Sequence, residues 1–366
     1  MWEDTADYST VAGPRWAVEA LLEFWHELET PRRFEVSHPR LVDLSRISER
    51  TAQRFNDSHS PAIAVARHRS GVGVQATARL QAEMMISPWW RYPMPPYPAE
   101  TGLPLLWEPG FQFRAAHGGG GIPDPFDPAK LLALRESAPT IADHRKAAGR
   151  TVAVLDTGIR GVGGTMLDFL DCDVHGPQLV AADDPHGHGT AVAKIIETIR
   201  GNAVINPVRV LDHRAEAKSY EVLAALMYTL FCGEYDLVNA SLTTPVFGSS
   251  ETALGRTIDF TLLACHANGV SPVPVLVAAA GNTRGKASGY PARVSEAVVV
   301  LAKDEQGRPA RYNSTPPEQA ITEWAYGGST TDSLGDLNSL TGLTGAGAQL
   351  WGTSFAAAVV SGAYLP

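Results

Sequence analysis

The stretch VAVLDTG, residues 152–158, decides the fold of this chain. Apolar residues run without interruption into Asp156, and Thr157-Gly158 then turns the chain. An unbroken apolar run of this kind is typical of a strand that is buried on both faces of a parallel sheet. Sites in α/β proteins form at the carboxyl ends of such strands. The stretch therefore predicts a buried strand that ends in a candidate functional carboxylate.

Strand and helix patterns alternate on the carboxyl-terminal side of this stretch. Further apolar runs predict strands at residues 205–211, 236–242 and 273–282. Helical spacing predicts helices at residues 190–199, 219–230 and 257–268. Helices between buried strands indicate an α/β fold with a mostly parallel central sheet, covered by helices on both faces. Residues 127–366 are expected to form this domain, which begins with a helical stretch within residues 127–145.

Residues 1–86 predict a small N-terminal α+β region. Apolar side chains recur at helical spacing over residues 16–28, and residues 62–81 alternate around a Ser-Gly turn as in a hairpin. Residues 87–126 are expected to form a linker, because prolines and aromatic residues crowd its first part and a glycine run lies near its end.

Composition excludes several classes of protein. The net charge of −9 and the scattered basic residues give no support to a nucleic-acid partner. No apolar stretch is long enough to cross a bilayer, and no secretory signal follows Met1, so we expect a cytoplasmic protein if Met1 is the native start. The 3 cysteines are too few and too widely spaced for a disulfide framework.

Further candidate functional residues lie where predicted elements begin or end. His188 stands between two glycines at a helix start, which suits an imidazole that other groups must approach closely. Ser354 lies at the start of a helix of small residues, where unpaired N–H groups favour a nearby oxyanion. Asn282 follows the strand and small residues of 273–281 and offers a carboxamide donor.

Together these residues carry a resemblance to a known family. VAVLDTG, GHGTAVA, AAAGN and GTSFAAAVVSG resemble the four signatures of the subtilases, in the same order along the chain. The resemblance implies a subtilisin-like three-layer α/β fold and a serine endopeptidase that acts on polypeptides. It also implies a catalytic triad of Asp156, His188 and Ser354, with Asn282 as a donor to the oxyanion.

The resemblance extends to substrate binding. Ser241 and Leu242 match the edge strand that pairs with extended substrates in this family. Thr243 stands where the family usually has glycine, so we expect a narrower first pocket. Ala280 and Gly281 are expected to leave room for substrate.

We expect no metal in the chemistry, because His186 and His188 have no Cys or Glu nearby at ligand spacing. His186 is instead expected at the surface or in the cleft. The sequence does not define a structural calcium site, although one is compatible with the family.

Other functions remain open at this point. The chain could be a noncatalytic module that docks peptides, or a serine hydrolase of esters or amides other than protein. Residues 1–149 could be a chaperone-like prosegment, a regulatory domain or a structural flank, and residues 1–86 could recruit a partner. A broad protease is hazardous in its own cytosol, so residues 87–113 are a candidate intramolecular inhibitor that runs beside Ser241-Leu242.

Overall fold

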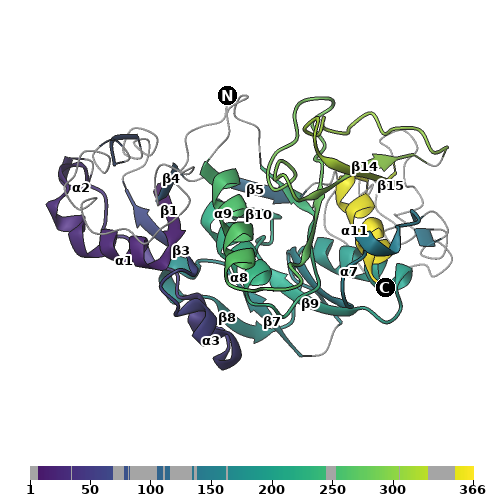
Figure 1. Cartoon of the computed structure of the whole chain (residues 1–366). Helices are drawn as coiled ribbons and strands as arrows, with labels where there is room; N and C mark the ends of the chain where they lie inside the picture. The colour runs from purple at the N-terminus through teal and green to yellow at the C-terminus, as the bar shows by residue number, and fades with distance from the viewer. Residues whose placement is uncertain are drawn as a thin grey trace.

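A computed structural model describes most of the chain (Figure 1). The described residues are 7–33, 35–68, 78–80, 82, 105–109, 112–115, 134–135, 138–161, 164–244, 253–304, 306–328 and 351–366. Of the hairpin predicted at 62–81, the first strand is present as part of β3 (Pro61–Arg67), and residues 69–77 lie outside the described residues. Residues 78–80 are helical, so the prediction of a strand there is wrong.

The main domain is built on an 8-stranded sheet. In spatial order its strands are β15 (Ile321–Tyr326), β14 (Val298–Lys303), β13 (Val275–Ala279), β11 (Leu237–Ala240), β6 (Thr151–Asp156), β9 (Val204–Arg209), β7 (Thr165–Asp168) and β8 (Gln178–Ala181). Every neighbouring pair is parallel except β7 with β8. The sequence prediction of a mostly parallel sheet is confirmed.

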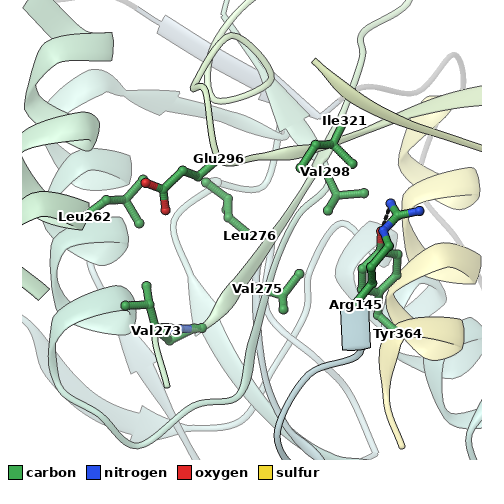
Figure 2. Close-up of a pocket in the computed structure, with 10 residues that line it drawn as sticks. Arg145, Leu262, Val273, Val275, Leu276, Glu296, Val298, Ile321 and Tyr364 are labelled. Atoms are coloured by element: carbon green, nitrogen blue, oxygen red, sulfur yellow. Dashed lines mark hydrogen bonds between the residues drawn. The ribbon is translucent and has the colours of Figure 1, made fainter. Parts of the chain in front are cut away.

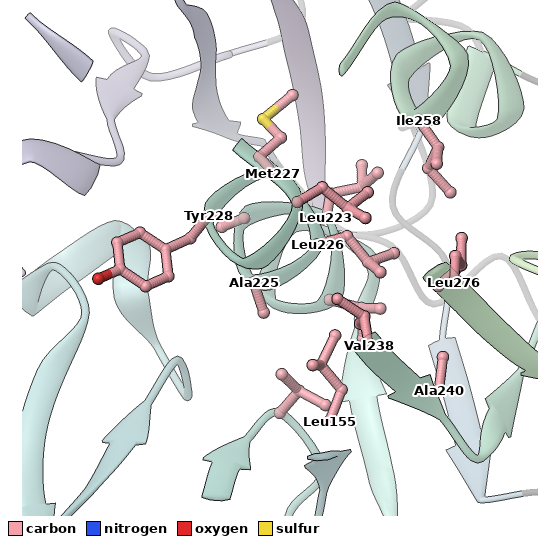
Figure 3. Packing of buried hydrophobic residues seen from close by; sticks show 14 of the residues in the cluster. Leu155, Leu223, Ala225, Leu226, Met227, Tyr228, Val238, Ala240, Ile258 and Leu276 are labelled. Carbon is pink, nitrogen blue, oxygen red and sulfur yellow. The ribbon is translucent and has the colours of Figure 1, made fainter. Parts of the chain in front are cut away.

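Helices cover both faces of this sheet. Among the described residues the long helices of this domain are α7 (His188–Ile199), α8 (Ser219–Phe231), α9 (Ala253–Ala267) and α11 (Thr353–Tyr364). The domain also contains the short α6 (Cys172–His175) and the 3-10 helix η5 (Asp143–Arg145). Side chains alternate along β6, so Leu155 packs in the cluster of α8 and α9, while Val154 packs in the cluster of α7 and α11. Figure 3 shows Leu155, Leu226 and Val238 meeting on the α8 side. The architecture is therefore a three-layer α/β/α fold.

A second, 4-stranded sheet lies at the N-terminal side, beyond α8 and α9 (Figure 1). Its order is β2 (Arg40–Leu41), β3 (Pro61–Arg67), β1 (Tyr8–Pro14) and β4 (Leu106–Pro109), and the pairing is antiparallel. Its helices are α1 (Arg15–Phe24), α2 (Glu29–Arg33) and α3 (Glu49–Phe55), with 3-10 turns η1 (Trp25–Glu27) and η2 (Leu44–Arg46). The helix predicted at 16–28 is thus α1 followed by η1.

The N-terminal sheet and the main domain share one hydrophobic core. Ile63 and Val65 of β3 belong to the same buried cluster as the inner residues of α8. The ring of Phe55 stacks on that of Tyr228 with centroids 5.6 Å apart. The hydroxyl of Tyr8 accepts a hydrogen bond from the N–H of Ser219 at 2.9 Å, which satisfies a donor at the start of α8.

A third sheet joins the predicted linker to the main domain. Its order is β10 (Glu216–Lys218), β5 (Gln112–Ala115) and β12 (Leu242–Thr243), and β5 is antiparallel to both neighbours. Both β4 and β5 come from residues 87–126. These parts of the predicted linker are therefore ordered strands of two sheets.

The helix predicted within residues 127–145 is wrong over part of its length. Leu134 and Arg135 are helical, but residues 138–142 are not, and η5 is a separate turn. Pro139 explains the break, because proline lacks an N–H and disfavours a helical residue before it. In the part of the chain that the structure describes, no helix is long and apolar enough to cross a membrane.

Candidate active site

Asp156 and His188 form a buried pair at the carboxyl edge of the sheet. Asp156 ends β6 and His188 begins α7, and both side chains are almost fully buried. Nδ1 of His188 lies 2.7 Å from Oδ1 of Asp156. The same Oδ1 accepts a hydrogen bond from the N–H of Thr157 at 2.8 Å. The carboxylate therefore fixes the orientation of the imidazole ring.

The glycine that follows His188 is explained by close contact with the β6 turn. A Cβ on Gly189 would lie 2.1 Å from the carbonyl oxygen of Gly158 and 2.9 Å from Cβ of Asp156. No larger residue fits without moving β6 away from α7. Gly189 therefore permits the short distance between Asp156 and His188.

Asp184 is a site residue that the sequence analysis missed. It is fully buried, and its Oδ1 accepts hydrogen bonds from the Thr157 hydroxyl at 2.8 Å and the Gly187 N–H at 2.6 Å. Its Oδ2 accepts from the N–H and hydroxyl of Thr190 at 2.8 and 2.6 Å. One carboxylate thus joins the turn after Asp156 to the first turn of α7. The N-cap of α7 is Gly187, so Asp184 does not stand at the position of a helix-capping signal.

Ser354 lies in the first turn of α11, and the residue that follows it contacts the ring of His188. The ring of Phe355, the following residue, has its centroid 5.5 Å from that of His188. The Ser354 hydroxyl donates a hydrogen bond to the carbonyl oxygen of Ser241 at 2.8 Å, and the Ser241 hydroxyl donates to the carbonyl oxygen of Ser354 at 3.0 Å. These reciprocal bonds fix the start of α11 against the end of β11.

Asn282 is oriented by the residue before Ser354. Its Oδ1 accepts hydrogen bonds from the N–H and the hydroxyl of Thr353, both at 3.1 Å. Its Nδ2 is buried and has no hydrogen-bond partner among the described residues. A buried donor without a partner is uncommon and calls for an explanation. An acceptor that arrives with a ligand provides one.

The predicted substrate-binding residues surround this point. Ala280 is buried at the end of β13, and Gly281 has a φ of 98° and donates its N–H to the Thr353 hydroxyl at 3.0 Å. Leu242 and Thr243 form β12, which pairs with Ala115 and Arg114 of β5. The candidate inhibitor segment is predicted at residues 87–113, whereas the residues of β5 that pair with β12, Arg114 and Ala115, directly follow that segment.

His186 lies near the pair but is not part of it. Its ring centroid is 6.3 Å from that of His188. Burial lowers the pKa of His186, and the adjacent His188 lowers it further. Across the described ranges, no group of three or more His, Cys, Asp or Glu side chains could hold a metal ion.

A separate pocket of about 250 Å³ lies at the opposite end of the strands (Figure 2). Val275, Val298 and Ile321, the first residues of β13, β14 and β15, line it together with Arg145. Arg145 is held there by Glu323 at 2.6 Å. Because Asp156 and Asn282 lie at the carboxyl ends of their strands, this pocket is distinct from their site.

Sequence comparisons identify relatives of the main domain. The model of the subtilase family, peptidase S8, matches residues 147–365. The chain is 28% identical to the thermostable alkaline protease of Halalkalibacterium halodurans over 189 residues, which is 48% of this chain and 47% of that protein. It is 28% identical to thermitase of Thermoactinomyces vulgaris over 223 residues, or 55% of this chain and 73% of thermitase. The chain thus spans about half the length of the alkaline protease.

The fold also resembles a solved structure over nearly the whole chain. The epidermin leader peptide processing serine protease (EpiP) of Staphylococcus aureus is similar with a TM-score of 0.54 and 14% identity, over 97% of this chain and 86% of that one. This likeness concerns the fold. The family match covers more than half of the sequence and contains all four signature motifs. The chain therefore belongs to the subtilase family.

Proposed function

We propose that this chain is a subtilisin-like serine endopeptidase. The observation that carries the proposal is the buried contact of 2.7 Å between Asp156 and His188, beside the helix start that carries Ser354. A histidine oriented by a carboxylate next to a serine is the arrangement that activates a hydroxyl nucleophile.

The reaction follows from these positions. The Ser354 hydroxyl leaves the carbonyl oxygen of Ser241 and attacks the carbonyl carbon of the scissile bond, while Nε2 of His188 takes its proton. Asp156 stabilises the imidazolium through Nδ1. His188 then protonates the leaving amine, and an acyl ester remains on Ser354. Water, deprotonated by His188, hydrolyses that ester, so the chemistry uses no metal or cofactor.

Asn282 is proposed to stabilise the oxyanion. Its buried Nδ2 and the backbone N–H of Ser354 are the two donors. Because Thr353 already fixes Oδ1, the amide needs no reorientation as negative charge develops on the substrate oxygen. Such preorganised donors commonly make the largest single contribution to the acceleration of acyl transfer.

Substrate binding is proposed to occur by strand addition. The strands β10 and β12 each pair with β5, so an extended peptide between them would form the same backbone hydrogen bonds. Leu242 and Thr243 would hold the peptide on one side, and Ala280 and Gly281 would border the side chain next to the cleaved bond. The partner of this surface is thus a polypeptide in extended conformation.

Hydrolysis of an unfolded protein and of small peptide amides tests this function. We expect cleavage of both, and loss of both in Ser354→Ala. Binding without cleavage would identify a noncatalytic peptide-docking module. Cleavage of esters without peptide amides would identify another kind of serine hydrolase.

We further propose that the N-terminal region regulates the site from within the chain. Residues 112–115 fill the position between β10 and β12 that a substrate would need. Arg114 forms an ion pair with Glu216 at 2.8 Å, and the N–H of Ala115 donates to the carbonyl oxygen of Ala215 at 3.1 Å. A segment on the same chain competes at high effective concentration, so even weak contacts would block the cleft.

Replacing residues 112–115 with a glycine-serine sequence tests this regulation. The peptidase rate on a small peptide amide should rise, because the replacement removes the Arg114 ion pair and weakens strand pairing. The matched control replaces residues 40–41 of β2, an edge strand of the N-terminal sheet, with glycine and serine. If the β5 variant folds and its rate does not exceed that of the full chain, the inhibitor role is wrong, and β5 is structural.

A further inference from the structure

We propose that Thr243 restricts this endopeptidase to substrates with a small side chain, alanine, glycine or serine, at the residue immediately before the cleaved bond. This inference rests on the proposed function and adds the substrate class. It concerns the space between β12 and the segment that carries Asn282.

The strand register identifies the substrate residue concerned. Leu242 pairs with Ala115 of β5, and the strands are antiparallel. Continuing that register by one residue sets the next position of a bound peptide opposite Ser241. The carbonyl oxygen of Ser241 is 2.8 Å from the hydroxyl of Ser354. The peptide residue opposite Ser241 therefore presents its carbonyl group to the nucleophile.

The side chain of Thr243 occupies the space beside that position. Gly281 directly precedes Asn282, and a Cβ built on it would lie 3.4 Å from Oγ1 and 3.6 Å from Cγ2 of Thr243. These are ordinary van der Waals distances. Thr243 thus leaves a space between β12 and Gly281 that is only about one methyl group wide.

Thr243 cannot readily move out of this gap. On its other side a Cβ at Gly289 would lie only 2.6 Å from Oγ1 of Thr243, so the backbone is packed closely there. Oγ1 also donates a hydrogen bond to the carbonyl oxygen of Thr244 at 3.3 Å. A β-branched side chain has few alternative rotamers. The Thr243 side chain therefore narrows the space for the substrate side chain whether or not a substrate is bound.

Peptidyl phosphonates provide the test on the full chain. Two reagents of identical sequence, one with alanine and one with phenylalanine at the reacting residue, are compared for their rates of reaction with Ser354. A small fluorophosphonate without a peptide measures the reactivity of Ser354 itself. We expect the alanine reagent to react at least about 10-fold faster, since even one methylene in a tight pocket changes the rate by about 10–200-fold.

Variants at position 243 separate volume from hydrogen bonding. Thr243→Gly should raise the phenylalanine rate by about 10-fold or more, and Thr243→Ala should do so in part if the glycine variant fails to fold. Thr243→Val keeps the shape without the hydroxyl, so it should retain the preference for alanine.

Three outcomes in the unmodified chain would overturn the inference: equal rates for the two peptide reagents, a faster rate for the phenylalanine reagent, or no reaction of either reagent while the fluorophosphonate reacts. In each case the proposal that Ser354 is the nucleophile would still stand. An unchanged ratio in both Thr243→Gly and Thr243→Ala would also overturn the inference. Failure of the fluorophosphonate to react would instead remove the proposed function, and this inference with it.

Discussion

Oδ1 of Asn282 accepts two hydrogen bonds from Thr353, one from its N–H and one from its hydroxyl. Thr353 directly precedes Ser354, so this contact fixes the amide relative to the candidate nucleophile. The remaining amide nitrogen is buried and has no hydrogen-bond partner among the described residues.

Asn282→Ala should therefore lower kcat with little change in KM, because the lost interaction is made mainly in the transition state. We expect a loss of about 10²–10³ in kcat, the range observed when the oxyanion asparagine of subtilisin is removed. Steady-state kinetics on a peptide amide measures it.

Asn313→Ala is the matched control for this variant. Asn313 also bridges backbone groups, with Oδ1 2.9 Å from the N–H of Ala302 and Nδ2 2.8 Å from its carbonyl oxygen. Its loss should lower stability and leave kcat unchanged. Equal kcat values for Asn282→Ala and the unmodified enzyme would contradict the oxyanion role.

Asp184 should act as a positioning residue for the Asp156–His188 pair. Asp184→Asn replaces one acceptor oxygen by an NH₂ group, which faces donors from Thr157, Gly187 or Thr190. The turn after Asp156 should then separate from α7. We expect kcat to fall by about 10-fold or more, with KM nearly constant and a shifted acid limb in the pH profile of kcat.

Asp304→Asn is the control for the predicted fall in kcat and shift of the pH profile in Asp184→Asn. Asp304 is also buried and accepts hydrogen bonds from the N–H groups of Gln306 and Arg308, but it lies in the loop after β14. Both variants should lose stability. A purely structural role for Asp184 would give the two variants the same unchanged pH profile.

Glu221 should make stability depend on pH. Burial raises its pKa from the ordinary 4.5 to about 7, although the N–H groups of Lys218 and Asp171 donate to its carboxylate. The folded state therefore holds this proton more tightly than the unfolded state. Between pH 4.5 and 7 this group should lower the free energy of unfolding as pH rises, by roughly 3 kcal/mol, with little further change above that range.

Urea unfolding of the Ser354→Ala protein at a series of pH values measures this slope without self-digestion. Glu221→Gln cannot ionise, so its stability should fall less between pH 4.5 and 7. Identical slopes for the two proteins would show that Glu221 is not responsible.

Chelators should leave peptide hydrolysis unchanged at the chemical step. In the proposed mechanism protons pass only between Ser354, His188, the leaving amine and water, and Asp156 stabilises the imidazolium, so no step needs a bound cation. Initial rates before and after dialysis against a chelator provide the measurement. A stoichiometric metal that restores a lost kcat would overturn this expectation; a change in thermal stability alone would indicate a structural ion.

Short sequence motifs were enough to predict that Asp156, His188 and Asn282 are candidate site residues. The carboxyl ends of parallel strands share one edge, so the sequence positions of Asp156 and Asn282 already placed them together. The contact of His188 with Asp156 follows from the glycines that allow α7 to approach β6. Asp184 was missed because its role depends on hydrogen bonds to two separate segments, which no single motif contains.

The N-terminal region was less predictable for a related reason. Its sheet pairs β1 with β3 and β4, which are far apart along the chain, and such pairings leave little local signal. The helix predicted over residues 127–145 is wrong at residues 138–142, where Pro139 interrupts helical structure. The packing of Phe55 on Tyr228 likewise depends on partners that periodicity cannot identify.

Labelling of the intact protein with a small fluorophosphonate tests the central claim most directly. We predict a single adduct, mapped by peptide mass spectrometry to Ser354, absent from Ser354→Ala and formed far more slowly in His188→Ala, because the hydroxyl would then lack its base. Folding of each variant is checked by circular dichroism. A folded protein with no adduct, or with the adduct on another residue, would contradict the account.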